Sequence, residues 1–356
     1  MEVVGIDKAL KKFKGKKVFI TGHTGFKGSW LTYLLDQNGA ITKGYSLKPN
    51  TNPSLYLNLK LSKNHFSIYS DINDYASIRK EIRFFKPDFI FHLAAQPLVL
   101  ESYDSPMKTF ETNFNGTLNL LNSIKEELLS CIAIFITTDK VYENNELNIP
   151  FSEEDKLGGN DPYSASKSAC ELLINSYQKS FFNNTKNHIS TARAGNVIGG
   201  GDWSKDRLIP DIIRSIYENK NLEIRNLNST RPWQHVLEPL YGYLKLALQM
   251  KKNPVKFLGS WNFGPETSDS RTVKEIVDES NISFQYDKGE LKEKVNEAKY
   301  LSLNIDKAKE KLNWKPKWKS EIAIKNTLNW YKDFYEGISV NELIKKDFKL
   351  YSKQNK

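Results

Sequence analysis

Tyr163 and Lys167 stand four residues apart, a spacing that could support proton transfer. Asp161 and Pro162 before them suit the cap and the first position of a helix, so the two side chains are expected one turn apart on the same helix face. A lysine ammonium that close stabilises a phenolate and lowers the pKa of the tyrosine from its ordinary value of about 10. Such a tyrosine can take the proton of a hydroxyl group while hydride leaves the same carbon.

An acid and a base stand side by side at Asp139 and Lys140, just after an apolar run that ends at Thr137. Open α/β sheets bind their ligands at the carboxyl ends of the strands. An acid–base pair at that place is what the elimination of water requires, and the hydroxyl of Thr138 could hydrogen-bond a ketone oxygen. The alternative is an ordinary surface turn, but the position after a strand favours catalysis.

A glycine-rich loop with the pattern TGxxGxxG runs from Thr21 to Gly28, between a strand-like and a helix-like segment. Glycines there allow a tight turn and let backbone N–H groups approach a pyrophosphate at the positive end of the helix, so the loop predicts a dinucleotide. The segment 44–48, at the end of the second strand, lacks the acidic residue that separates NAD from NADP, and we favour NAD. Asp71 could accept a hydrogen bond from adenine or cap a turn.

Short apolar runs alternate with helix-like segments over the first 194 residues. Continuous apolar strands separated by helices are typical of a parallel sheet covered on both faces. The prediction is an α/β fold, a Rossmann-like doubly wound parallel sheet with a smaller C-terminal substrate-binding lobe. Strands are expected at 17–21, 40–47, 66–70, 88–93, 132–137 and 188–194, and helices at 25–38, 74–86, 107–126 and from Pro162 onward.

The alternation breaks after Ala194, where segments rich in Gly, Trp and Arg interrupt shorter helices. We therefore expect residues 1–194 to form the NAD-binding domain, with returning segments near 233–262. Residues 195–232 and 263–356 are expected to form mainly the substrate-binding lobe. The polar stretch after about Gly337 is expected to fray.

The composition excludes several classes of protein. The 356 residues carry 52 Lys+Arg against 42 Asp+Glu, a net charge of +10 that suits an anionic small molecule such as a nucleotide diphosphate. The lysines before residue 18 indicate a solvated lead-in to the first strand, and without a recognition module they do not predict nucleic-acid binding. Two cysteines without a CxxC or a Cys/His cluster predict neither disulfides nor a metal site. No apolar run could span a membrane or serve as a signal peptide, so a cytoplasmic protein is expected.

Together, these motifs resemble the extended short-chain dehydrogenase/reductase family. His92-Leu93-Ala94-Ala95 and the run 113–117 support the resemblance, with His92 itself expected to be a packed strand residue. The resemblance implies an NAD-dependent enzyme. It places at the cofactor Gly22, His23, Thr24, Gly25, Phe26, Lys27, Gly28, Asp71, Ile72, Leu93, Ala94, Ala95, Asn113, Thr137, Tyr163, Lys167, Asn196 and Val197.

Within that family, the Asp139-Lys140 pair resembles the sugar-nucleotide 4,6-dehydratases, in the branch that acts on CDP-glucose. The resemblance implies conversion of CDP-D-glucose to CDP-4-dehydro-6-deoxy-D-glucose and water by an internal NAD redox cycle. The product would supply deoxysugars for surface polysaccharide, such as the O-antigen of lipopolysaccharide. A homodimer or dimer-based tetramer, assembled through the helices that follow the fourth and fifth strands, is also implied. The matching runs are 22–30, 94–99, 158–164, 193–203, 231–240 and 261–265, and the implied substrate contacts are Gln96, Asn196, Asp202, Trp203, Arg207, Arg231 and Tyr300.

The resulting hypothesis gives each catalytic residue a role. Tyr163, supported by Lys167, takes the proton from O4 of the glucose. Lys140 then removes the C5 hydrogen and Asp139 protonates the departing C6 hydroxyl, while Thr138 bonds the ketone. Because a base must be neutral, either burial lowers the pKa of Lys140 or these two residues exchange duties.

The second-lobe contacts have structural alternatives. Arg207 and Arg231 would hold the diphosphate or form a salt bridge, and Trp203 would pack on a base or fill the core of the lobe.

Three other functions use the same motifs. A nucleotide-sugar 4-epimerase would share the fold, the cofactor and Tyr163, but would return hydride to C4 and keep the C6 oxygen. A 4,6-dehydratase could act on another nucleotide-glucose, because the base is implied by resemblance alone. A non-catalytic dinucleotide sensor would not need the intact set of Thr138, Asp139, Tyr163 and Lys167.

Overall fold

A seven-stranded parallel sheet forms the centre of the molecule, in the order β11-β6-β5-β4-β1-β2-β3. The structure is a computed structural model, and it describes residues 5–127, 130–147, 149–218, 222–224, 227–279, 286–287 and 300–353. The strands are β1 (Lys17–Thr21), β2 (Ile41–Ser46), β3 (His65–Tyr69), β4 (Phe89–His92), β5 (Ile132–Ile136), β6 (His188–Ala194) and β11 (Gly259–Phe263). The predicted α/β doubly wound sheet is confirmed.

The strand order reverses at β1, which lies between β2 and β4. Thr21 at its end pairs with Tyr45 of β2 and His92 of β4, so the glycine-rich loop leaves the sheet level with the ends of both neighbours. In open parallel sheets the crevice at such a reversal is the usual ligand site.

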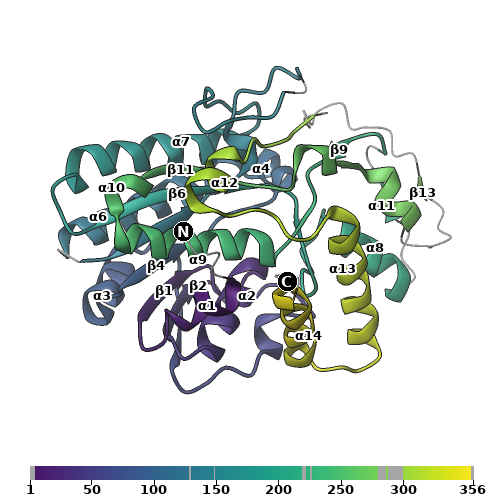
Figure 1. Cartoon of the computed structure of the whole chain (residues 1–356), viewed down its shortest axis with the longest axis horizontal. Coiled ribbons are helices and arrows are strands. Elements are labelled where there is room, and N and C mark those ends of the chain that lie inside the picture. Colours follow the sequence, from purple (N-terminus) through teal and green to yellow (C-terminus); the bar gives the residue numbers. More distant parts are fainter. Residues whose placement is uncertain are drawn as a thin grey trace.

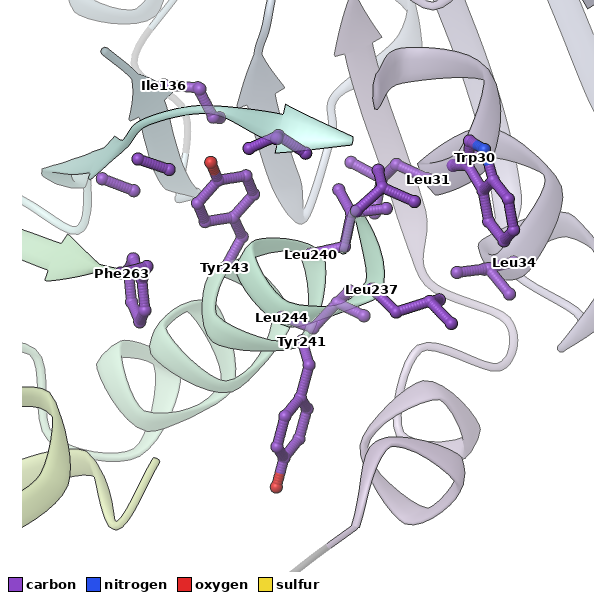
Figure 2. Packing of buried hydrophobic residues seen from close by; sticks show 14 of the residues in the cluster. Trp30, Leu31, Leu34, Ile136, Leu237, Leu240, Tyr241, Tyr243, Leu244 and Phe263 are labelled. Atoms are coloured by element: carbon purple, nitrogen blue, oxygen red, sulfur yellow. The ribbon is translucent and has the colours of Figure 1, made fainter. Parts of the chain in front are cut away.

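Helices cover both faces of the sheet (Figure 1). The helices α1 (Ile6–Lys11), α2 (Phe26–Gln37) and α9 (Leu237–Lys252) contribute to one apolar cluster. Those that contribute to the other are α3 (Tyr75–Phe85), α6 (Gly116–Glu126) and α7 (Pro162–Tyr177). Figure 2 shows Leu237 and Leu240 of α9 pointing toward Leu31 and Leu34 of α2.

The second lobe gathers α8 (Leu208–Glu218), α11 (Val273–Glu279) and α13 (Ser320–Tyr335) on the side of the molecule opposite α3 and α6 (Figure 1). The chain returns to the main sheet at β11, so the two halves interleave in sequence. The exact domain division remains a prediction. The other elements are η1 (Tyr56–Asn58), α4 (Val99–Asp104), α5 (Pro106–Phe110), η2 (Glu111–Asn115), η3 (Asp139–Val141), η4 (Gln178–Phe182), β7 (Val197–Ile198), β8 (Leu222–Glu223), β9 (Thr230–Arg231), β10 (Gln234–His235), α10 (Pro254–Phe257), η5 (Thr267–Asp269), β12 (Arg271–Thr272), β13 (Tyr286–Asp287), α12 (Asp306–Leu312) and α14 (Val340–Lys353).

Two expectations about the ends of the chain are wrong. The lysine-rich lead-in contains α1, which buries Ile6 and Leu10, and the stretch after Gly337 contains α14, which buries Leu343 and Ile344. In both segments apolar residues recur at helical spacing, and that stripe packs on the core while the lysines stay exposed. No helix in the described part of the chain is long and apolar enough to cross a bilayer.

Candidate active site

The glycine-rich loop fits closely against the end of β4. Gly22 has φ +71°, and a Cβ there would lie 2.6 Å from the amide nitrogen of Ala94. A Cβ on Gly28 would lie 2.0 Å from the carbonyl oxygen of Gly22. Gly25 caps α2 without a side-chain hydrogen bond, so the first N–H groups of the helix remain available to an anion. The glycines therefore build the cradle that the TGxxGxxG pattern predicts.

Hydroxyl groups and a neutral imidazole occupy the end of β2, where an acidic residue is absent. Thr24 Oγ1 lies 2.8 Å from Ser46 Oγ, and the buried His23 has Nε2 2.7 Å from Ser67 Oγ. Burial, followed by the charge of His65, lowers the pKa of His23 to about 3, so the ring is neutral at ordinary pH. Asp71 is exposed and accepts from the amide of Asn73, which is the turn role considered above.

Asn113 connects the loop after β4 to α7 by hydrogen bonds. This buried side chain accepts from the amide of Gln96 at 2.8 Å and donates to Ser166 Oγ on α7 at 2.8 Å. The helix expected over 107–126 opens into the π-helical turn η2 at this point, and π-turns are frequent at functional sites. The side-chain nitrogen of Gln96 donates to the carbonyl of Leu98 and to Thr109 Oγ1, and its side-chain oxygen accepts from the amide of Leu98. The polar atoms of this side chain are therefore engaged within the chain. Ile72 lies three residues after the end of β3, and Leu93 and Ala95 follow the end of β4.

The helix of Tyr163 and Lys167 begins where the sequence predicts. Asp161 accepts from the amide of Ser164 in a reciprocal capping box, and Pro162 occupies the first turn. Both Tyr163 and Lys167 are buried on one face of α7. However, Lys167 Nζ donates to the carbonyl of Ile136 at 3.4 Å, and burial raises the pKa of Tyr163 to about 12, a shift that a hydrogen bond with Thr138 opposes. The expected lowering of this pKa by Lys167 is therefore wrong for this arrangement, because burial outweighs it.

Asp139 and Lys140 form an ion pair at the carboxyl end of β5, in the short helix η3. Their Nζ and Oδ1 atoms are 3.8 Å apart, with Asp139 fully buried and the Lys140 side chain 30% exposed. Thr138 Oγ1 donates to Asp139 Oδ1 at 2.9 Å. Asp139 Oδ2 has no hydrogen-bond partner among the described residues. A buried carboxylate oxygen left without a donor is costly unless a ligand supplies one.

Residues of the second lobe reach the same crevice. Asp202 is buried and pairs with Arg207 at 3.4 Å, the salt bridge considered as an alternative role for this arginine. Arg231 is buried in β9 and donates to the carbonyl of Thr230. Trp203 is 5% exposed and packs against aromatic rings from α13, which agrees with the core role considered above. Its contact with the substrate stays a prediction.

Tyr300 stands between two hollows and is 42% exposed. One hollow lies under the loop that carries Phe151, and the other includes Thr230, next to Arg231. Asn196, after β6, has φ +44° and its carbonyl accepts from Gln234, while Val197 is buried. Of the predicted substrate residues, Tyr300 lines both hollows and Arg231 follows Thr230, which lines one of them.

Comparison with known proteins identifies the family. The family model described as GDP-mannose 4,6 dehydratase matches residues 19–327. The chain belongs to this family. A CDP-glucose 4,6-dehydratase of Salmonella typhimurium is 45% identical over 333 residues, 91% of this chain and 93% of that protein.

Two solved structures match the fold of this chain. An epimerase of Methanothermobacter thermautotrophicus matches with TM-score 0.79 and 24% identity over 96% of this chain and 97% of that one. A dTDP-glucose 4,6-dehydratase of Bacillus anthracis, in complex with NAD, matches with TM-score 0.74 and 21% identity over 90% and 98% of the two chains. These likenesses show the fold.

Two further residues that shape the site of this GDP-mannose 4,6 dehydratase family member were not predicted from the sequence. A Cβ on Gly195 would lie 1.7 Å from Asp139 Oδ2, so only glycine leaves room for the carboxylate. Glu171, one turn after Lys167, accepts from Thr137 Oγ1 at 2.5 Å and from Arg193 at 2.9 Å. The glycine after β6 and the continuation of the Tyr163 and Lys167 spacing to 171 were the available signals.

The cations of the site outnumber its carboxylates, which suits a substrate with two phosphate charges. No group of three or more His, Cys, Asp or Glu in the described ranges could hold a metal ion. The charged residues are Lys27, Lys140, Lys167 and Arg207 against Asp139 and Asp202.

Proposed function

We propose that this chain is an NAD-dependent 4,6-dehydratase that converts CDP-D-glucose to CDP-4-dehydro-6-deoxy-D-glucose and water. The observation that carries the proposal is the Asp139–Lys140 pair at the end of β5, linked through Thr138 to Tyr163. A reductase that only moved hydride would need no second proton-moving pair there. The relative at 45% identity, a CDP-glucose 4,6-dehydratase, supports the same substrate.

The crevice fits a dinucleotide because the glycines at 22 and 28 leave no room for side chains and the N-terminus of α2 is open. The loop 22–28 would hold its pyrophosphate and Lys167 its ribose. The chemistry that bound NAD would supply is reversible hydride transfer, from C4 of the sugar and back to C6, with no net oxidation.

The residues of the chain move the protons. Because burial raises the pKa of Tyr163 to about 12, the tyrosine must first lose its own proton, and the phenolate then accepts the proton of the O4 hydroxyl. Thr138 would donate a hydrogen bond to the oxygen that becomes the ketone. The ketone acidifies the C5 hydrogen. The ion pair holds its proton on Lys140. Once that proton has moved to Asp139, the neutral amine of Lys140 removes the C5 hydrogen and Asp139 protonates the C6 hydroxyl as it leaves. Thr138 and Lys140 both contact Asp139, an arrangement that suits three side chains acting on neighbouring carbons of one sugar.

A panel of nucleotide-glucoses tests the proposal. With CDP-glucose the product is expected to be lighter than the substrate by one water and to carry a keto group, detected by mass spectrometry. A product of unchanged mass with inverted C4 would identify a 4-epimerase. Loss of water from another nucleotide-glucose, and not from CDP-glucose, would support the dehydratase reaction but would show that the substrate carries a different nucleotide base.

We also propose that two copies associate through the helices that follow β4 and β5. Large apolar side chains are exposed there, including Met107 (76%) and Leu172 (60%). Light scattering after gel filtration is expected to give twice the mass of one chain, or four times for a pair of dimers. Replacing Leu172 by Glu should yield single chains if this face is the interface, and should leave the mass unchanged if it is not.

The setting of the enzyme belongs to the same proposal. A cytoplasmic dehydratase would draw on soluble nucleotide sugars and feed deoxysugars into surface polysaccharide such as O-antigen. Deletion of the gene is then expected to remove 6-deoxyhexose from the polysaccharide, measured by sugar analysis.

A further inference from the structure

Lys27 occupies a position that helix energetics do not favour. It lies in the first turn of α2, next to Phe26, the first residue of the helix. The N-terminus of a helix carries a partial positive charge, so a cation there is opposed by the helix dipole. A residue that breaks a local rule in this way often serves a site instead of the element that carries it.

The surroundings of Lys27 come from three other segments. The charged groups that face it are Asp139 after β5, Lys167 on α7, and Asp202 and Arg207 of the second lobe. Lys27 is half-buried, and no hydrogen bond or ion pair engages its ammonium among the residues with described positions. The two cations and two carboxylates around Lys27 balance one another, so the ammonium of Lys27 leaves a local excess of positive charge.

The packing of α2 explains how Lys27 reaches the second lobe. The ring of Phe26 lies 3.1 Å from the Cβ that Gly199 would carry, and Trp30 Nε1 donates to the carbonyl of Gly200 at 2.9 Å. The segment that leads to Asp202 is therefore docked on the first turns of α2. Lys27 lies at the junction between the cofactor loop and the substrate-binding lobe.

We propose that Lys27 binds the diphosphate of the nucleotide-sugar substrate, although it stands in the loop expected to hold the cofactor. This inference rests on the proposed function. A diphosphate is the chemistry that an unpaired ammonium acted on by the charges of Arg207 and Lys167 would recognise, and both the substrate and the dinucleotide contain one. The groups facing Lys27 come from the catalytic strand end and the second lobe, and this favours the substrate.

The charge of Lys27 should make this binding depend on pH. Burial, then the charges of Arg207 and Lys167, lower its pKa to about 7. Below that pH the ammonium is present and strengthens binding of an anion. Above it the proton must be taken up on binding, so the contribution of Lys27 declines as pH rises.

Calorimetric titration of Lys27→Met and Lys27→Arg with CDP, and separately with NAD, tests the proposal. At pH 6.5 Lys27→Met is expected to weaken CDP binding roughly tenfold relative to the unaltered protein, the loss of one charged hydrogen bond. That ratio should fall toward one by pH 8.5, where the unaltered lysine has lost its proton. Lys27→Arg should keep CDP affinity at both pH values, because arginine stays charged.

The affinity for NAD is expected to change less than twofold in both variants. The exposed Lys16, at the opposite end of β1, provides a matched control as Lys16→Met. Weakened NAD binding with unchanged CDP binding would assign Lys27 to the cofactor and overturn the proposal, as would no change with either ligand. If the unaltered protein binds another nucleoside diphosphate and not CDP, the proposed base is wrong, and the same comparison with that nucleotide decides the role of Lys27. A variant that fails to fold is replaced by Lys27→Gln in the same titrations.

Discussion

Asp139 is fully buried, and the space behind its free oxygen exists only because residue 195 is glycine. Thr138 and Lys140 both contact the other oxygen, at 2.9 and 3.8 Å. The position of the Asp139 carboxylate therefore depends on the missing side chain at residue 195 as well as on the contacts of Thr138 and Lys140. Two predictions follow at the scale of single residues.

Gly195→Ala is expected to push the carboxylate of Asp139 out of place and to lower kcat roughly 100-fold, since displacement of a reacting group by about 1 Å can cost that much. Turnover of CDP-glucose measures the effect. Gly264→Ala is the control, because the nearest atom to its Cβ would be 3.5 Å away, an ordinary contact. Equal activity in both variants would contradict the prediction.

Lys140→Met and Asp139→Asn should stop the reaction at different points. Without its candidate base, Lys140→Met is expected to lose exchange of the C5 hydrogen with deuterated water, whereas Asp139→Asn should keep that exchange and lose water elimination. Product isotope content by mass spectrometry measures both. The reverse pattern would show that the two residues exchange duties.

At the scale of elements, one buried carboxylate ties α7 to three strands. Glu171 accepts from Thr137 after β5, from Thr191 and Arg193 of β6, and from Ser260 of β11. Burial opposes its ionisation, but Arg193 and these hydroxyls lower the pKa of Glu171 below its ordinary value. The ion pair between Glu171 and Arg193 therefore fixes α7, the helix that carries Tyr163 and Lys167, on the sheet.

Glu171→Leu is expected to lower the free energy of unfolding by about 3–5 kcal/mol, because it leaves the guanidinium of Arg193 buried and unpaired. The double variant Glu171→Leu/Arg193→Leu should lose less than the sum of the single variants. Urea unfolding of all four proteins gives the coupling. Additive losses would mean that the two side chains act independently.

At the scale of the whole molecule, the C-terminal helix α14 is fastened to α9 by a buried acid. Glu238 accepts from the amides of Lys317 and Trp318 at 2.9 and 2.8 Å and from Tyr351 Oη at 2.6 Å. Burial raises the pKa of Glu238 to about 7, with these hydrogen bonds opposing the shift. The folded chain therefore holds a proton that the unfolded chain releases near its ordinary value of 4.5.

Because the folded state binds this proton more tightly, the free energy of unfolding is expected to fall by up to roughly 3 kcal/mol as pH rises from 4.5 through 7. Glu238→Gln removes this dependence. The difference in the free energy of unfolding between the two proteins, measured in urea at pH 5 and pH 8, isolates the contribution of Glu238. The buried His23 and His92, whose pKa values are lowered to about 3, contribute equally in both proteins. A constant difference would contradict the prediction.

The parallel sheet, the cofactor loop and the start of the helix that carries Tyr163 could all be predicted from the sequence. Each depends on residues close together in the chain, such as the apolar run of β5 or the Asp161–Pro162 cap, whose spacing sets the local conformation. Sequence and comparison also agree on the family, and both support the dehydratase reaction.

Which distant residues share an environment became clear from the folded chain alone. Four features depend on segments far apart in sequence. They are the room that Gly195 leaves for Asp139, the bonds of Glu171 to three strands, the burial of Trp203 and the raised pKa of Tyr163. The same is true of α1 and α14, which were expected to be solvated or frayed and are helices because the core covers their apolar stripes. Periodicity specifies what an element can bury, but the partner that it meets sets burial, charge and function.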